Sequence, residues 1–397
     1  MKKITLSFFI LICLSGCWNY NELNDYSIVS GVSIDKSGDE YEASILISNS
    51  PKSNSSDSNS SQSQVVVYSG KGDSIFSALK QIGLISPKEL YFGSFSVLVI
   101  SEEVAKDGIN NAIDFFVRYP NARKNFYVVL SKDDKAKDTL KIMSPLSSFP
   151  SQKITDNVKT TTELQGIISS INFNDLLSTI LSDGVETTIN CIEVEGDKEK
   201  GSSQENLESS EPEAYTKLGN LGIFKGDKLI DWANRDESLG INMINGKISE
   251  MFMDIEYNDG YVVIDSTSFS SNITPTLKDN KPNIDIEISG EARIIEVKGD
   301  INLEDSKTIE KLQKETNKKI KKRINEALDL AIENKTDIFG FGKLFFQEYP
   351  KYFNSVKKDW NKSLDQININ IKSDLMLKNK VSSKNSLEEI NDKEKNN

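Results

Sequence analysis

The segment 91–118 reads YFGSFSVLVI SEEVAKDGIN NAIDFFVR, and it joins a predicted strand to a predicted helix. Its first ten residues are largely apolar, which predicts a buried strand. Ser101 then offers a side-chain cap for a helix N-terminus, and Glu102 and Glu103 suit the positive end of the helix dipole. The helix is expected to run to the end of the segment, before Pro120. Its apolar residues fall on one stripe, which contains Val104, Ala105, Ile109, Ala112, Ile113 and Phe116.

Elements of the same two kinds flank this segment. Strands are expected at Tyr26–Asp35, Tyr41–Ser48, Val65–Tyr68 and Asn125–Leu130, and helices at Ser74–Ile82 and Asp133–Met143. Because strands alternate with helices, residues 17–146 are predicted to form a mixed α/β domain. The segment Asn49–Gln64 consists mostly of Ser, Asn and Gln, so we expect a long mobile loop between two of the strands.

A second region is expected over residues 147–255. The stretch Pro145–Pro150 predicts the boundary at its start, and a strand is expected around Cys191. Residues 196–213 are acidic, rich in serine and nearly free of large apolar side chains, which predicts a solvated loop or linker. Farther along, two strand-like runs flank Lys225-Gly226-Asp227, a sequence typical of a hairpin turn.

A third region is expected over residues 256–376, with strands at Tyr261–Phe269 and Ile284–Val297. A long amphipathic helix is predicted over 303–334, because apolar residues recur there at helical spacing. The charged tail 377–397 is expected to be disordered. The predicted fold class is therefore α+β, with three mixed α/β domains, antiparallel-rich sheets, packed helices and a long amphipathic helix in the third domain.

The N-terminus has the pattern of a lipoprotein signal. Met1-Lys2-Lys3 is basic, the next 11 residues are apolar, and Leu14-Ser15-Gly16-Cys17 resembles a bacterial lipobox. The apolar run is too short to cross a bilayer as a helix, which needs about 20 residues. We therefore expect removal of the signal peptide 1–16 and attachment of an S-diacylglycerol and an N-acyl group at Cys17, which would hold the protein on membrane lipid. An ordinary signal with a chance cysteine is the alternative.

The composition excludes several classes of function. The net charge is −12, and it becomes −14 when the signal takes Lys2 and Lys3 with it, so no nucleic-acid partner is expected. The 397 residues include no histidine, which removes the commonest general base and the usual zinc ligands. We expect no metal, no cofactor and no enzymatic activity, although a hydrolase based on two carboxylates remains an alternative. Cys191 would be the one free cysteine of the processed chain, and a small buried residue is expected there.

Short motifs follow one another along the chain in an order that resembles one known family. They are Cys17-Trp18, NELND at 21–25, GVSID at 31–35, LYFG at 90–93, DFFVR at 114–118 with Arg123, LGIFKGDKL at 221–229, DIFGFG at 337–342, Tyr349-Pro350 and Trp360. This series resembles the Ger(x)C family, the lipoprotein C subunit of bacterial spore germinant receptors. Two stretches depart from the pattern: the loop 49–64 looks like an insertion, and the segment 230–234 shifts the usual Trp.

The resemblance implies a non-enzymatic subunit that is required for nutrient-triggered spore germination. It also implies a location on the outer face of the inner spore membrane, with two integral membrane receptor subunits as partners. A solute-binding lipoprotein of a membrane transporter is the alternative. Such a protein would have two similar doubly wound lobes joined by a hinge.

Three residues are candidates for interaction with partners or membrane. Trp18 follows the predicted anchor and suits the lipid headgroup region, although it equally suits a cap on the first domain. Arg118 and Arg123 flank Pro120 in an acidic protein. They mark a partner contact, or they are solvated and paired with local acids.

Overall fold

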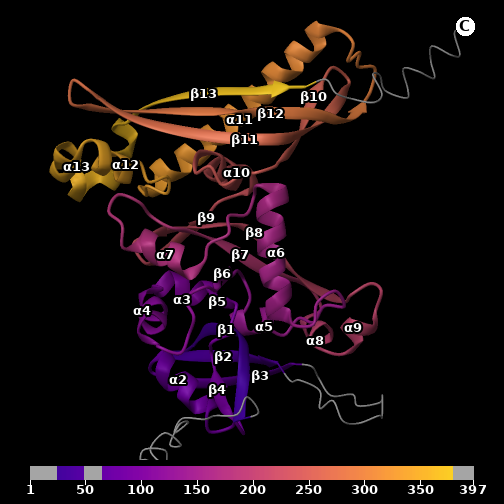
Figure 1. The fold of residues 1–397 in the computed structure, drawn as a ribbon, viewed down its shortest axis with the longest axis vertical. Helices are drawn as coiled ribbons and strands as arrows, with labels where there is room; N and C mark the ends of the chain where they lie inside the picture. Colours follow the sequence, from indigo (N-terminus) through magenta and orange to yellow (C-terminus); the bar gives the residue numbers. More distant parts are fainter. Residues whose placement is uncertain (1–24, 49–64, 379–397) are drawn as a thin grey trace, which may run out of the picture.

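The computed structural model describes residues 25–48 and 65–378. The signal peptide 1–16, Cys17, Trp18, the loop 49–64 and residues 379–397 of the tail lie outside the described residues. The described portion is elongated, with one sheet toward each end and helix α10 (Arg235–Ile244) between them (Figure 1).

Nine strands form the first sheet. They are β1 Tyr26–Ser37, β2 Glu40–Ser48, β3 Val65–Gly72, β4 Glu89–Tyr91, β5 Val97–Ser101, β6 Tyr127–Ser131, β7 Thr188–Gly196, β8 Ala214–Lys225 and β9 Lys228–Trp232. Their order is β3-β2-β1-β5-β6-β7-β8-β9, and β4 pairs with β1. The central strands β1, β5, β6 and β7 are parallel neighbours, whereas the strands toward both edges are antiparallel. The prediction of antiparallel-rich sheets is wrong for this centre, because the chain returns between parallel strands through helices.

Helices cover both faces of this sheet. They are α2 Ile75–Ile82, α3 Glu102–Asp107, α4 Asn110–Arg118, α5 Ala136–Thr139, α6 Pro150–Gln165 and α7 Phe173–Ile180. Successive residues of a strand point to opposite faces, so Leu98 and Ile100 of β5 pack in the core with α2, α3, α4 and α7. Val97 and Val99 pack in a second core with α5 and α6. The apolar run before Ser101 is therefore a strand buried on both faces.

The helix expected after Ser101 is broken into α3 and α4. Ser101 caps α3 as predicted, since its Oγ accepts the N–H of Val104 at 3.3 Å. The break falls at Gly108, which has φ +132°. Ile109 donates its N–H to the carbonyl of Asp227 at 2.9 Å, and a Cβ on Gly108 would lie 2.6 Å from the Asp227 carboxylate. The predicted single helix is wrong because the β8–β9 hairpin turn docks at this point.

The boundary expected after residue 146 does not interrupt the first sheet. Strand β7 pairs in parallel with β6 through Leu130 and Cys191. Pro150 is the first residue of α6, a position where the missing N–H of proline costs no helix hydrogen bond. Strands β7, β8 and β9 of the expected middle region therefore complete the first sheet, and the division into three domains stays a prediction.

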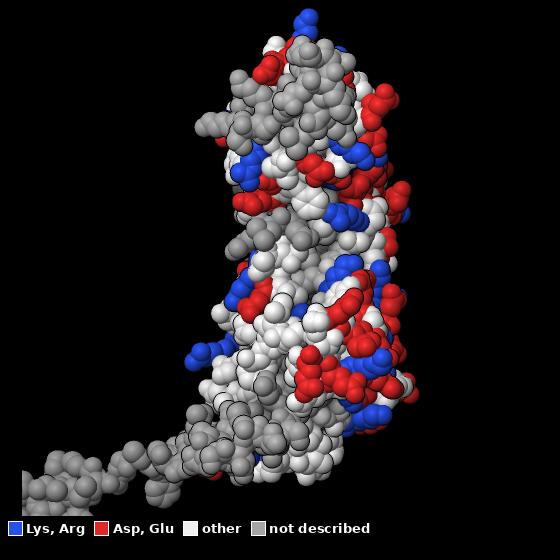
Figure 2. All heavy atoms as spheres, turned by 90° about the vertical axis from the view of Figure 1, so that its right-hand side faces the viewer, with Lys and Arg blue, Asp and Glu red and all other residues white. Residues whose placement is uncertain are grey.

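The acidic segment 196–213 folds back against the first sheet. It contains the short helices α8 (Lys198–Gly201) and α9 (Glu205–Glu208). Asn206 is fully buried, donates to the carbonyls of Met143 and Ala214 at 2.7 and 2.9 Å, and accepts the N–H of Ala214 at 3.2 Å. Figure 2 views the side of the molecule that bears α8 and α9, where many charged side chains gather. One buried amide thus fixes a segment whose composition is typical of a linker.

The second sheet contains β10 Phe252–Tyr257, β11 Gly260–Lys278, β12 Lys281–Lys298 and β13 Asn368–Leu377, in that order. Asp279 and Asn280 join β11 to β12 with φ values of +51° and +60°, which fits a type I′ hairpin turn. The predicted long helix is confirmed as α11, Ser306–Asn334, whose apolar residues pack in the same core as the sheet. The segment before β13 contains α12 Phe341–Glu348, α13 Pro350–Val356 and the 3-10 helices η2 Lys357–Lys362 and η3 Leu364–Gln366. A mixed α/β fold with a long helix is thus confirmed.

Candidate functional site

Figure 1 shows α2 toward the end of the molecule farthest from the second sheet. A groove lined by both aromatic and charged side chains lies between α2 and α4. A capping box begins α2: the Ser74 side chain accepts the N–H of Ser77 at 3.1 Å, and the Ser77 side chain accepts the N–H of Ser74 at 3.0 Å. The buried stripe of α2 consists of Ile75, Ala78, Leu79 and Ile82. Phe76 lies outside this stripe, is 51% exposed, and approaches the ring of Phe115 at 6.5 Å.

Two adjoining cavities of about 690 and 620 Å³ form this groove. Both are lined by Phe76, Phe115 and Tyr119, and the Tyr119 ring stacks on Phe115 at 5.2 Å. Burial raises the pKa of the Tyr119 hydroxyl, so the group stays neutral. Asp25, the first described residue, lines the larger cavity. Such aromatic walls suit an apolar ligand or surface.

Arg118 lies at the C-terminal end of α4 and lines the smaller cavity. Its Nε is 2.9 and 2.8 Å from the two carboxylate oxygens of Asp114, one helical turn earlier. The arginine lowers the pKa of Asp114, and the carboxylate raises the pKa of Arg118. Arg123 is exposed and makes no salt bridge within the described ranges. Arg118 is thus paired with a local acid, and a partner contact through either arginine stays a prediction.

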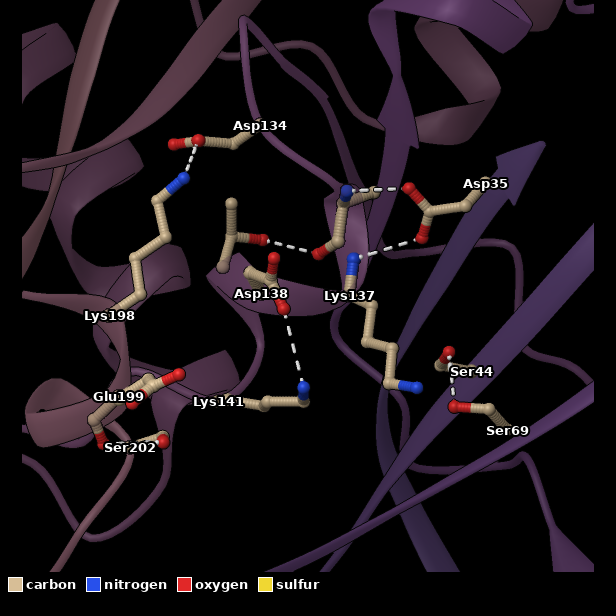
Figure 3. A network of polar contacts seen from close by, with 12 residues as sticks. Asp35, Ser44, Ser69, Asp134, Lys137, Asp138, Lys141, Lys198, Glu199 and Ser202 are labelled. Atoms are coloured by element: carbon tan, nitrogen blue, oxygen red, sulfur yellow. Dashed lines mark hydrogen bonds and ion pairs between the residues drawn. The ribbon is translucent and has the colours of Figure 1, made fainter. Parts of the chain in front are cut away.

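A second polar cluster lies around α5 (Figure 3). Asp35 ends the GVSID motif on β1, and its two carboxylate oxygens accept the N–H groups of Ala136 and Lys137 at 2.7 and 3.0 Å. Since α5 has no side-chain cap of its own, Asp35 caps this helix from another strand. Lys137 also pairs with Glu42 on β2 at 3.1 Å. Asp35 of the GVSID motif therefore holds α5 against the first sheet.

The buried Asp35 carboxyl should make the free energy of unfolding depend on pH. Burial raises its pKa from 3.8 to about 6, and the two backbone N–H donors offset this only in part. Because the folded state then holds the proton more tightly than the unfolded chain, the contribution of Asp35 to the free energy of unfolding falls as the pH rises from about 4 to about 6. Relative to Asp35→Asn, the unmodified protein should lose on the order of 3 kcal/mol across that interval. Urea unfolding at several pH values measures this difference, and a constant difference would contradict it.

A third cluster surrounds Asp337 at the start of the DIFGFG motif. Asp337 is fully buried, and its carboxylate accepts the N–H groups of Phe339, Phe341 and Gly342 at 3.2, 3.1 and 2.7 Å. It also accepts the indole N–H of Trp360 at 2.7 Å. Burial raises the pKa of Asp337, and the four donors oppose that rise. The motif thus folds around one carboxylate, a role that sequence reasoning missed.

The same motif holds the loop that precedes β7. The carbonyl of Asp337 accepts the N–H of Glu186 at 2.7 Å, and Gly184 accepts the N–H of Lys343 at 2.9 Å. A Cβ on Gly342 would lie 2.6 Å from the indole nitrogen of Trp360 and 2.8 Å from the Cα of Gly184. This glycine allows three chain segments to meet. The motif therefore joins the C-terminal helices to the first sheet.

The Trp of the departing segment 230–234 also has a structural role. Trp232 donates its indole N–H to Glu102 of α3 at 2.9 Å, and Lys132 lies over its ring at 5.4 Å from the centroid. The Trp thus fastens the β8–β9 hairpin to the helix that follows β5.

The described residues offer no recognisable set of catalytic groups. Cys191 is buried, and burial raises the pKa of its thiol to about 12, so it is neutral and not a nucleophile at ordinary pH. Between residues 25–48 and 65–378, no group of three or more His, Cys, Asp or Glu side chains is placed to hold a metal ion. Over the same ranges no helix is both long and apolar enough to cross a bilayer.

Two family models match this chain, and the division between them falls inside the first sheet, because one model ends within β7 and the other begins within β8. A model described as "Spore germination protein N-terminal domain" matches residues 19–194, and one described as "Spore germination B3/GerAC like, C-terminal" matches residues 219–380. The chain belongs to the GerAC/Ger(x)C family of spore germination proteins. This is the family of germinant-receptor C subunits, so the resemblance carried by the ordered motifs is confirmed. The two matched regions of this Ger(x)C chain are separated by the acidic segment 196–213.

Individual relatives resemble the Ger(x)C chain along nearly its whole length. Spore germination protein KC of Bacillus subtilis (strain 168) is 28% identical over 390 residues, which cover 95% of this chain and 96% of the relative. Spore germination protein B3 of the same organism is 22% identical over 367 residues, which cover 91% and 92%. The crystal structure of the GerBC protein matches with a TM-score of 0.53 at 15% identity, covering 91% of this chain and all of that one. This last likeness shows a shared fold.

Proposed function

We propose that this protein is the lipid-anchored, non-enzymatic C subunit of a nutrient germinant receptor, on the outer face of the inner spore membrane. The observation that carries the proposal is the match of two family models to residues 19–194 and 219–380, which begins two residues after the lipobox cysteine Cys17. Two integral membrane subunits would be its partners. Confinement by the lipid would raise the effective concentration of the partner surfaces, so modest interfaces would be sufficient for assembly.

The state of the buried carboxyls supports a non-enzymatic role. Both oxygens of Asp35 and both oxygens of Asp337 accept N–H groups of the protein itself. A general base must also come within hydrogen-bond reach of its substrate, whereas Asp35 and Asp337 are only 2% and 0% exposed. These two carboxylates are committed to structure, which counts against a hydrolase built on them.

The architecture gives no support to a solute-binding lipoprotein. Such a protein would have two similar doubly wound lobes, whereas this chain has one mixed sheet of nine strands and one four-stranded sheet with a single parallel pairing. The two halves therefore offer no matching pair of lobes around a central cleft.

Substitution of the lipobox cysteine tests the anchor. In a Cys17→Ala variant we expect loss of radiolabelled lipid incorporation, release of the protein from the membrane fraction, and slow or absent germination on the matching nutrient. Cys191→Ala is the matched control, because that thiol is buried and neutral. It should leave labelling and fractionation unchanged. If Cys17→Ala stays in the membrane fraction as fully as the parent does, the proposed lipid anchor is wrong.

Detergent co-purification from dormant spores tests the partners. An affinity tag placed after the described residues should recover two multi-pass membrane proteins together with this chain. Recovery of the chain alone, under conditions in which it stays folded, would remove the receptor-subunit proposal.

A further inference from the structure

Two adjacent aliphatic side chains project from the tip of the molecule beside the groove. Leu84 and Ile85 lie in the turn between α2 and β4 and are 80% and 55% exposed. The turn is held by backbone hydrogen bonds, since the N–H groups of Leu84, Ile85 and Ser86 donate to carbonyls of the last turn of α2 at 2.9 to 3.1 Å. The Ser86 hydroxyl also donates to the carbonyl of Lys88 at 2.7 Å. A fixed backbone therefore presents both side chains to the outside.

The position of this turn relates it to the proposed anchor. Residues of the turn line the same cavity as Asp25, the first described residue. Asp25 is eight residues beyond Cys17, and eight fully extended residues span at most about 29 Å. A protein held by lipid at Cys17 therefore keeps Asp25 within that distance of the bilayer surface, and the turn lies beside Asp25 across one cavity. Figure 1 shows α2 and β4 at the opposite end of the long axis from the second sheet.

The charges around the turn are balanced, so they do not repel an anionic lipid surface as the acidic chain as a whole would. Exposed Lys80 and Lys88 flank the aliphatic pair, and Glu89 is the only acid among residues 80–89. Asp25 lines the same cavity, so two lysines and two acids surround the turn and its surroundings are close to neutral in a chain whose net charge is −12. Lysine side chains extend along apolar surface while their ammonium groups reach headgroup phosphates. Two aliphatic side chains between two lysines match the layering of a bilayer, in which hydrocarbon lies beneath the charged headgroups.

We propose that the turn 83–88 inserts Leu84 and Ile85 into the surface of the lipid bilayer, as a second attachment beside the lipid on Cys17. This inference rests on the proposed anchor and adds an orientation to it. Attachment at Cys17 alone would leave the orientation of the molecule on the membrane undefined. Two attachments at one tip make the long axis point away from the membrane, with the second sheet at the far end.

A fluorophore at the turn tests the insertion. The other cysteines should not react with the dye, because Cys17 would be acylated and Cys191 is buried with its thiol neutral. A Leu84→Cys variant of the full chain, acylated at Cys17, is labelled with the dye NBD and placed in protein-free vesicles of phosphatidylcholine and phosphatidylglycerol. We expect a several-fold rise in NBD emission with a shift to shorter wavelength, and quenching by lipids that carry a nitroxide in the upper acyl chain.

Leu146→Cys provides the matched control, since Leu146 is 95% exposed and does not line the groove. Its NBD emission should stay that of a dye in water. Flotation of the same vesicles reports the anchor separately. If the protein floats with the vesicles but the dye at position 84 behaves as it does at position 146, the insertion is overturned and the anchor stands. If emission at position 84 changes only when receptor membrane proteins are added, the turn binds protein and the proposal is wrong. If the protein does not float, the anchor itself fails.

Discussion

Asp337→Ala is expected to cause the largest loss of stability among the substitutions proposed for this protein. The change removes the shared acceptor of four N–H groups, which come from Phe339, Phe341, Gly342 and Trp360. Each buried donor left without a partner costs roughly 1–3 kcal/mol, so the free energy of unfolding should fall by about 4 kcal/mol or more. Urea unfolding followed by circular dichroism and by the tryptophan emission measures the loss.

Two further variants separate this explanation from a general sensitivity of the region. Asp337→Asn keeps the shape and one acceptor oxygen but turns an NH₂ group toward N–H donors, so its loss should be smaller than that of the alanine variant. Asp359→Ala removes an exposed carboxylate from the nearby η2, where it pairs with Lys362, and should leave the unfolding midpoint unchanged. Equal stability of Asp337→Ala and the parent would show that the carboxylate does not hold the motif.

Gly240→Ala is expected to have the next largest effect, because Gly240 is where α10 crosses α11. A Cβ at this position would lie 2.1 Å from the carbonyl oxygen of Arg323 and 2.8 Å from the Cβ of Ala327. Alanine favours an isolated helix by about 1 kcal/mol over glycine. Here the clash is with backbone, and overpacking of this kind costs about 1–3 kcal/mol or more. We therefore expect net destabilisation of about 2 kcal/mol, measured by thermal or urea unfolding.

The crossing also contains an ion pair that reports on the geometry. Arg323 is nearly buried, and its Nε is 2.7 Å from Asp236 of α10. Separation of the helices would stretch this pair, so Asp236→Asn should cost less stability in the Gly240→Ala background than in the parent. Gly83→Ala is the control, since Gly83 is exposed and has the helical φ of −62°. If the Gly240→Ala protein is as stable as the parent, α10 and α11 can move apart without a loss in the free energy of unfolding.

Both substitutions act on the junction between the two sheets, where the cores and loops of the two ends meet. Leu221 and Ile223 of β8 belong to the same hydrophobic core as α10, α11 and the second sheet. Asp337 fastens the C-terminal helices to the loop before β7 through Glu186. If the turn at Leu84 meets the bilayer, a rigid junction would hold the second sheet at a fixed height above it.

Local patterns in the sequence were enough to predict elements whose causes are local. The Ser101 cap, the turn at Gly226 with φ +62°, and the helix over 303–334 each depend on neighbouring residues. The helix α6 escaped prediction because it is largely polar, and Pro150 was interpreted as a boundary when it is the helix start. The candidate surface residues Arg118 and Arg123 were identified by composition, which gives no information on what they contact.

The sequence by itself determined the family, through an ordered set of motifs, and many of the strands and helices, through periodicity and capping. Only the tertiary structure decided where those motifs act. Asp35 caps a helix whose first N–H belongs to a residue 101 positions away, and Gly108 breaks a helix because a distant hairpin docks there. Hydrogen bonds and close backbone approaches of this kind depend on segments far apart along the chain, so no local pattern contains them.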